Sequence, residues 1–173
     1  LPSRGATSLV QIFHGGLRAP RAVTGRQPVS ASDVDDQGAE EPARALTESE
    51  VEGLVAAFVE AAVRCERAGF DGVELHGAHG YLIAQFLGTK TNRRSDRWGG
   101  DLADRAAFLK AIVDGVRAAT SPDFLLAVRL SPQIDAMGIR LVESLELATW
   151  LPAWGVDLLH ISCWDAFAAS EEE

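Results

Sequence analysis

The apolar positions along the chain form short continuous runs that alternate with longer stripes at helical spacing. Four of these runs are β-branched or alternating, which is typical of strands. They predict strands over Ser8–Phe13, Gly72–Leu75, Phe124–Leu130 and Val156–Ile161. Because the runs are nearly all apolar, they favour a parallel sheet that is buried on both faces.

The stripes between the runs predict helices. Thr47 and Glu50 fit a capping box at the start of the first helix, and Gly69 is placed to end it. A second helix is predicted after Asp101. The apolar positions on one face are Val51, Leu54, Val55, Phe58, Ala62 and Cys65 in the first helix, and Leu102, Ala106, Leu109, Val113 and Val116 in the second.

A third helix is predicted from about Val142 to Ala153, closing at Gly155, although Pro152 is unfavourable in its last turn. The alternation of strands and helices indicates the α/β class, as either a (β/α) barrel or an open doubly wound sheet. No G-x-G-x-x-G motif follows a strand, and the Gly15-Gly16 pair opens a long loop. The open dinucleotide-binding sheet is therefore disfavoured.

Residues 1–173 are predicted to form one domain with two unusually long loops and a tail over residues 166–173. The loop over residues 15–46 is rich in Pro, Ser and acidic residues, so we expect it to be exposed and lid-like. Its acidic residues are Asp33, Asp35, Asp36, Glu40 and Glu41. The loop over residues 87–100 carries Lys90, Asn92, Arg93, Arg94, Asp96 and Arg97. Hydrogen bonds and ion pairs are expected to brace this second loop, with anion binding as the alternative.

Composition and charge exclude several classes of function. The chain has 173 residues, of which 47% are hydrophobic and 24% charged, and its net charge of −9 disfavours nucleic acid and anionic membranes as partners. No apolar run approaches the about 18 residues that a membrane span needs. Cys65 and Cys163 lack metal-ligand spacing and cannot form a disulfide framework, which favours free thiols in a cytoplasmic protein.

Candidate chemistry gathers after the second predicted strand, where His76, His79 and Tyr81 follow one another. In α/β proteins the ends of strands are where ligands bind. A phenol has a reference pKa of about 10, which suits Tyr81 to donating a proton at neutral pH. Packing roles for these side chains remain open. A metal site with His14, His160 or a carboxylate as the third ligand also remains open, but no H-x-H, H-E-x-x-H or C-x-x-C pattern is present.

Two polar residues lie inside predicted strands. Gln11 must find partners for its amide, either in the backbone or on the edge of a heteroaromatic ligand. Arg129 keeps its charge and so needs an anionic partner. Glu74, which has the same parity as His76, is one candidate partner, and a ligand that develops negative charge is the other.

These residues resemble the Old Yellow Enzyme family of FMN-dependent oxidoreductases. The resemblance rests on Q-I-F-H-G-G (11–16), E-L-H-G-A-H-G-Y-L (74–82), T-N-R-R-S-D-R-W-G-G (91–100), LAVRLS around Arg129 and GVDLLHIS (155–162). It implies a partial (β/α)8 TIM barrel with about four parallel strands and intervening helices, corresponding to the third to sixth family strands. Trp98 stands where the family usually has tyrosine, and Leu17 where many members have arginine.

The resemblance also implies the chemistry. NADH or NADPH would reduce FMN, which would pass hydride to the alkene of an α,β-unsaturated carbonyl such as an enone. His76 and His79 would bind the carbonyl oxygen, and Tyr81 would be the proton donor. Gln11 would bind the pyrimidine edge of the flavin, and Arg129 would stabilise its reduced, anionic form.

A complete TIM barrel needs eight strands and about 250 residues. The chain begins at Leu1 within a few residues of a strand and ends shortly after another, so both ends are expected to be cut. Four strands would leave two unpaired edges and an apolar interior. We therefore expect self-association or a complementary barrel half. An inactive fragment or split-gene partner is one alternative, and a metal-dependent hydrolase barrel is another.

Overall fold

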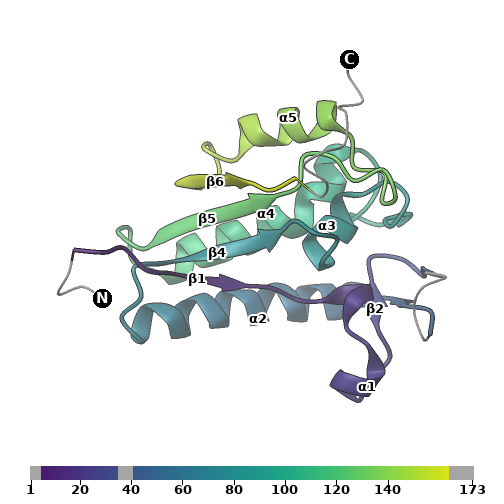
Figure 1. Cartoon of the computed structure of the whole chain (residues 1–173), viewed down its shortest axis with the longest axis horizontal. Helices are drawn as coiled ribbons and strands as arrows, with labels where there is room; N and C mark the ends of the chain where they lie inside the picture. Colours follow the sequence, from purple (N-terminus) through teal and green to yellow (C-terminus); the bar gives the residue numbers. More distant parts are fainter. Residues whose placement is uncertain (1–4, 35–40, 164–173) are drawn as a thin grey trace.

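A computed structural model describes residues 5–34 and 41–163. Asp35, Asp36, Glu40 and the predicted tail over residues 166–173 lie outside these residues. The main sheet has four parallel strands in the order β1, β4, β5 and β6 (Figure 1). Their bounds are Leu9–Ile12, Gly72–Gly77, Leu125–Leu130 and Leu158–Ile161. The predicted strands are thus confirmed, but β4 runs two residues further than expected and includes His76.

The three predicted helices are present as α2 (Glu48–Arg67), α4 (Leu102–Ala119) and α5 (Leu141–Trp150). The capping box of α2 is confirmed, because the Thr47 hydroxyl accepts from the Glu50 amide at 3.2 Å and the Glu50 carboxylate accepts from the Thr47 amide at 2.9 Å. Helix α5 ends three residues earlier than predicted. Pro152 has no amide hydrogen and cannot continue a helix.

The core lies between the helices and one face of the sheet. Val73 and Leu75 of β4 and Leu126 and Val128 of β5 are fully buried there. Aromatic rings join the helices across this layer, and Phe86 stacks on Phe108 with ring centroids 4.4 Å apart. Because successive strand residues point to opposite faces, Glu74 and His76 lie on the other face. We call the face that carries Glu74 and His76 the inner face.

The inner face is partly open to solvent, and the edges of β1 and β6 have no neighbouring strand among the described residues. Leu9 is 36% exposed, Phe13 58% and Leu158 53%. Apolar side chains of this size are rarely left exposed as a group. The expectation of two open edges is confirmed for residues 5–34 and 41–163, but the inner face is only partly apolar, because it also carries the polar residues Gln11, Glu74, His76, Arg129 and His160.

The loop over residues 15–46 differs from expectation in part, since several of its residues are buried. It contains four short elements: η2 (Gly16–Arg18), α1 (Arg21–Thr24), β2 (Val29–Ser30) and β3 (Arg44–Ala45). Leu17, Ser30, Ala31, Ala43 and Leu46 are buried. The expectation of an exposed loop was therefore wrong for these residues, but it is confirmed for residues 20–27, which are exposed. The polar composition of the loop did not indicate this burial, because it results from hydrogen bonds between the loop backbone and side chains of the second long loop.

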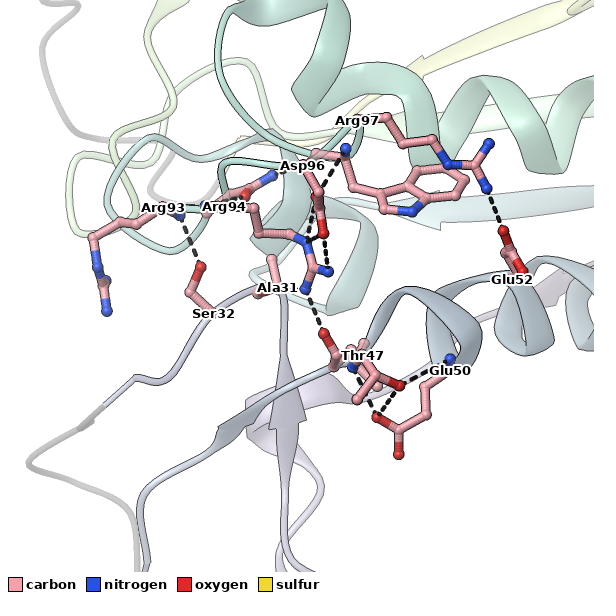
Figure 2. Close-up of polar contacts among 12 residues, drawn as sticks. Ala31, Ser32, Thr47, Glu50, Glu52, Arg93, Arg94, Asp96 and Arg97 are labelled. Carbon is pink, nitrogen blue, oxygen red and sulfur yellow. Dashed lines mark hydrogen bonds and ion pairs between the residues drawn. The ribbon is translucent and has the colours of Figure 1, made fainter.

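Figure 2 shows how the second long loop holds the first. The Arg94 guanidinium donates to the carbonyls of Ala31 at 2.8 Å and Leu46 at 2.5 Å, and it forms an ion pair with Asp96. The Ser32 hydroxyl accepts from the Arg93 amide at 2.8 Å. These contacts support bracing as the role of residues 92–97, because the Arg94 side chain is only 8% exposed and already has its acceptors.

Besides the short elements η2 and α1, one longer helix was not predicted. Helix α3 (Leu82–Leu87) is a single run of buried residues, so its sequence carries no polar face from which helical periodicity could be read. It is the first helix after β4, and Tyr81 is its N-cap residue. Within residues 5–34 and 41–163, no helix combines the length and hydropathy that crossing a membrane requires.

Candidate functional site

His76, His79 and Tyr81 come together at the carboxyl end of β4, as their spacing predicted. The rings of His76 and Tyr81 meet edge to face with centroids 4.8 Å apart, and those of His76 and His79 do so at 4.9 Å. Phe13, just beyond β1, packs 5.0 Å from Tyr81. Two imidazoles and a phenol therefore share one aromatic cluster with groups that can donate protons or hydrogen bonds.

A sharp turn after β4 places His79. Its φ of 55° is left-handed, and the φ of Gly80 is 70°. For a residue other than glycine this conformation costs about 1–3 kcal/mol and persists only where surrounding contacts enforce it. Gly80 suits this turn because its φ lies in the left-handed region, which glycine adopts without strain. Backbone strain of this kind is concentrated at functional sites.

The two histidines are neutral at physiological pH. Burial lowers the pKa of His76 to about 4, helped by the nearby His79 and Arg129. Burial also lowers the pKa of His79, with Arg129 and Arg18 acting in the same direction. The Ala78 amide donates to Nδ1 of His76 at 3.2 Å, so the proton of the neutral ring is on Nε2. His76 is therefore a neutral hydrogen-bond donor.

Arg129 lies opposite His76 in the register of β5 with β4. Its Nη2 donates to the Ser162 hydroxyl at 2.9 Å, and that hydroxyl lies 2.7 Å from Nε2 of His79. Nε of Arg129 is buried without a hydrogen-bond partner in the described part of the chain. A buried donor of this kind is rare and points to a missing acceptor.

Glu74 was expected as a possible partner of Arg129, but its carboxylate binds other residues. Its Oε1 accepts from Nε2 of Gln11 at 2.5 Å, and its Oε2 lies 2.8 Å from Nδ1 of His160. The charge of Arg129 helps to lower the pKa of Glu74, but the two side chains, both in the described part of the chain, form no ion pair. Gln11 thus has a side-chain partner, rather than a backbone one, and its amide remains exposed.

Two residues of the site were missed in the sequence. Ser162 follows β6, and only the register of β5 with β6 brings it to Arg129. Gln85 lies on the unpredicted helix α3, where it donates to the Gly80 carbonyl at 2.8 Å and accepts from the Leu17 amide at 3.2 Å. A fully buried glutamine in an apolar run was the available signal.

A cavity of about 600 Å³ lies away from this cluster, between η2, α1 and the start of α2. His14 is among its lining residues, but His76, His79, Tyr81, Gln11 and Arg129 are not. No group of three or more His, Cys, Asp or Glu side chains within residues 5–34 and 41–163 is placed to hold a metal ion. The chemistry-bearing side chains are thus on the inner face of the sheet and do not line this cavity.

The sequence matches the model of the NADH:flavin oxidoreductase / NADH oxidase family over residues 2–172. The chain belongs to this family. It is 48% identical over 171 residues to "Probable NADH-dependent flavin oxidoreductase YqiG" of Bacillus subtilis, with 95% of this chain and 46% of the relative covered. It is also 41% identical over 170 residues to NADH:fumarate oxidoreductase of Klebsiella pneumoniae, covering 94% of this chain and 18% of the relative.

Two solved structures, of morphinone reductase and of an Old Yellow Enzyme homologue, have the same fold as this chain. Morphinone reductase superposes with a TM-score of 0.86 at 32% identity, covering 98% of this chain and 50% of that one. The Old Yellow Enzyme homologue of Zymomonas mobilis superposes with a TM-score of 0.86 at 30% identity, covering 99% and 53%. The resemblance and the partial TIM barrel are both confirmed, and the chain spans about half the length of these flavin oxidoreductases.

The residues on the inner face fit a flavin. The buried Nε of Arg129 needs an acceptor, and the exposed amide of Gln11 can meet a ring that carries both carbonyl and N–H groups. The family description and a structure of morphinone reductase with tetrahydroNAD support FMN with a nicotinamide reductant. Gln11 and Arg129 thus place hydrogen-bond donors that match such a ring on the inner face.

Proposed function

We propose that the protein is an FMN-dependent NAD(P)H oxidoreductase of the ene-reductase type, which reduces the alkene of an α,β-unsaturated carbonyl compound. The observation that carries this proposal is the neutral His76, a fixed Nε2–H donor that lies beside Arg129 and 4.8 Å from the Tyr81 ring. Bound FMN would supply hydride that it has taken from NADH or NADPH.

His76 and His79 bind the carbonyl oxygen of the substrate in this proposal. As hydride reaches the β-carbon, negative charge develops on that oxygen. A donor already fixed at this point stabilises the charge without reorganising, and such a donor is worth about 10²- to 10³-fold in rate in other enzymes. The contacts from Ala78 to His76 and from Ser162 to His79 provide this fixed orientation.

Tyr81 donates the proton that the α-carbon needs. Its ring is held between Phe13 and His76. Arg129 and Gln11 act on the other partner in the reaction. A fixed guanidinium stabilises negative charge on a flavin ring, while an amide recognises its pyrimidine edge.

A second candidate is supported by the open inner face. Leu9, Phe13 and Leu158 are exposed beside the free edges of β1 and β6. In this case residues 1–173 act only when further strands close the barrel, supplied by the same protein, by a second chain or by a second copy. Closure would bury the apolar side chains and pair the strand edges.

Flavin titration tests the proposed function. Addition of FMN to the protein expressed from its complete gene should shift the visible flavin bands, and cyclohexenone should then accelerate anaerobic oxidation of NADH or NADPH. Arg129→Leu should weaken FMN binding, whereas Arg97→Leu, on an exposed side chain, should not. Absence of FMN binding by the complete protein would overturn the assignment. If residues 1–173 bind FMN only after a complementary half is added, the second candidate is supported.

A further inference from the structure

Glu74 has no role in the proposed function, although it is the most central acidic group of the inner face. Its side chain is 13% exposed, and both oxygens are hydrogen-bonded. Its partners come from the two edge strands, Gln11 from β1 and His160 from β6. A carboxylate buried to this degree is unfavourable unless its partners are well placed. Its position therefore calls for an explanation.

The strand register explains how His160 reaches Glu74 across β5. Ala127 is the β5 residue opposite Glu74, and it is also opposite Leu158 of β6. A methyl group at Ala127 leaves room above β5. His160, two residues beyond Leu158, bends back over this space to the carboxylate. Glu74 thus links three strands through one pair of oxygens.

The charge of Glu74 determines which way the amide of Gln11 is turned. Burial tends to raise the pKa of Glu74, but hydrogen bonds from His160 and Gln11 outweigh it, and the pKa is lowered. An ionised carboxylate accepts hydrogen bonds and cannot donate them. Gln11 must therefore turn its NH₂ group toward Glu74, which leaves Oε1 and one N–H free for a ligand.

This pair of groups, one acceptor and one donor, is complementary to an imide edge, in which an N–H lies beside a carbonyl. We infer that Glu74, oriented by His160, is a positioning residue that locks the amide of Gln11 for recognition of the flavin pyrimidine edge. The inference rests on the proposed function. Without Glu74 the amide could rotate by half a turn and present its groups in the wrong order.

The test uses FMN dissociation constants, measured by quenching of flavin fluorescence, and urea unfolding of the ligand-free protein. Glu74→Gln removes the charge and allows both amide orientations, so FMN should bind about tenfold more weakly, which corresponds to one well-placed hydrogen bond. In the double variant Gln11→Ala with Glu74→Gln, FMN should bind less than about threefold more weakly than in Gln11→Ala alone. Glu60→Gln, on an exposed carboxylate of α2, is the matched control and should leave the affinity unchanged.

An exchange of the two residues separates the hydrogen bond between them from the amide at position 11 that faces the flavin. The double variant Gln11→Glu with Glu74→Gln restores a carboxylate–amide hydrogen bond, so stability should recover. FMN affinity should not recover, because the carboxylate at position 11 cannot donate to the flavin and repels its carbonyl oxygens. Recovery of both quantities would overturn the inference and reduce Glu74 to a structural residue.

The remaining outcomes distinguish this inference from the proposed function. If Gln11→Ala weakens FMN binding but Glu74→Gln does not, the role of Glu74 is wrong and the flavin assignment stands. If the complete wild-type protein binds no FMN, the proposed function fails, and the positioning of Gln11 for a flavin fails with it.

Discussion

Arg129 donates a hydrogen bond to Ser162 at 2.9 Å, and the same serine hydroxyl lies 2.7 Å from Nε2 of His79. One small side chain after β6 therefore connects the guanidinium of β5 with the strained turn after β4. The contact joins the residue proposed to hold FMN to a residue proposed to bind the substrate oxygen. Its removal should affect both ligands without changing either ligand-binding side chain.

Ser162→Ala should weaken binding of phenols, which mimic the substrate oxygen, by about fivefold in the FMN-loaded protein. The estimate follows from the roughly 1 kcal/mol that one hydrogen bond contributes. Titration of p-hydroxybenzaldehyde, followed by the absorbance of the flavin, measures the affinity. Cys163→Ala, on the exposed neighbour, serves as control. Equal affinities in the Ser162→Ala variant and the wild type would remove Ser162 from the site.

Tyr81→Phe should leave reduction of FMN by NADH or NADPH intact and slow reduction of the alkene by about 10²-fold or more, the usual contribution of a positioned general acid. The substitution keeps the ring that packs on His76 and removes only the hydroxyl. Stopped-flow traces of the two half-reactions separate these effects. Unchanged alkene turnover would show that another group donates the proton.

Acid should destabilise the protein through His76. Its pKa is lowered from 6.5 in the unfolded chain to about 4 in the folded one, so between these values the unfolded state binds the extra proton. The free energy of unfolding is therefore unaffected by protonation of this residue above pH 6.5. It decreases by about 3 kcal/mol as the pH falls from 6.5 toward 4.

Urea unfolding at pH 7 and pH 4.5 checks this. His76→Asn, which does not titrate, should lose markedly less stability over that interval than the wild type. Because the pKa values of His14 and His79 are also lowered by burial, some loss should remain in the variant. An identical loss in both proteins would contradict the assignment to His76.

Arg94→Ala should cost about 3 kcal/mol of stability, because it removes the cation paired with Asp96 and the donor to two backbone carbonyls (Figure 2). Arg97→Ala is the matched control. Arg97 is 59% exposed and pairs with Glu52 at the surface, so its loss should cost less than about 1 kcal/mol. Thermal unfolding measures both. Similar costs for the two variants would argue against bracing by Arg94.

Residues 1–173 expressed alone should self-associate through the inner face. Phe13→Ser with Leu158→Ser removes the two most exposed apolar side chains of that face and should shift the sedimentation profile toward monomer. Val23→Ser is the control, since Val23 is 81% exposed but lies on α1, away from the sheet. A monodisperse wild-type monomer would contradict the prediction.

Much of the fold could be predicted because it depends on local patterns. The capping box at Thr47, the four apolar runs and the parity that places Glu74 and His76 on one face all follow from residues close in sequence. The proximity of His76, His79 and Tyr81 followed for the same reason. Helix α3 was missed because buried helices and buried strands look alike in short apolar runs.

The strands, the main helices and the cluster after β4 follow from the sequence alone, since each is encoded within a few neighbouring residues. The family follows from five motifs that lie between residues 11 and 162. Tertiary structure alone decided the partners. Arg129 binds Ser162 rather than Glu74, and Glu74 joins Gln11 to His160, 86 residues away along the chain. Such pairings depend on strand register and on the room left by Ala127, and neither can be read from the spacing of residues along one strand.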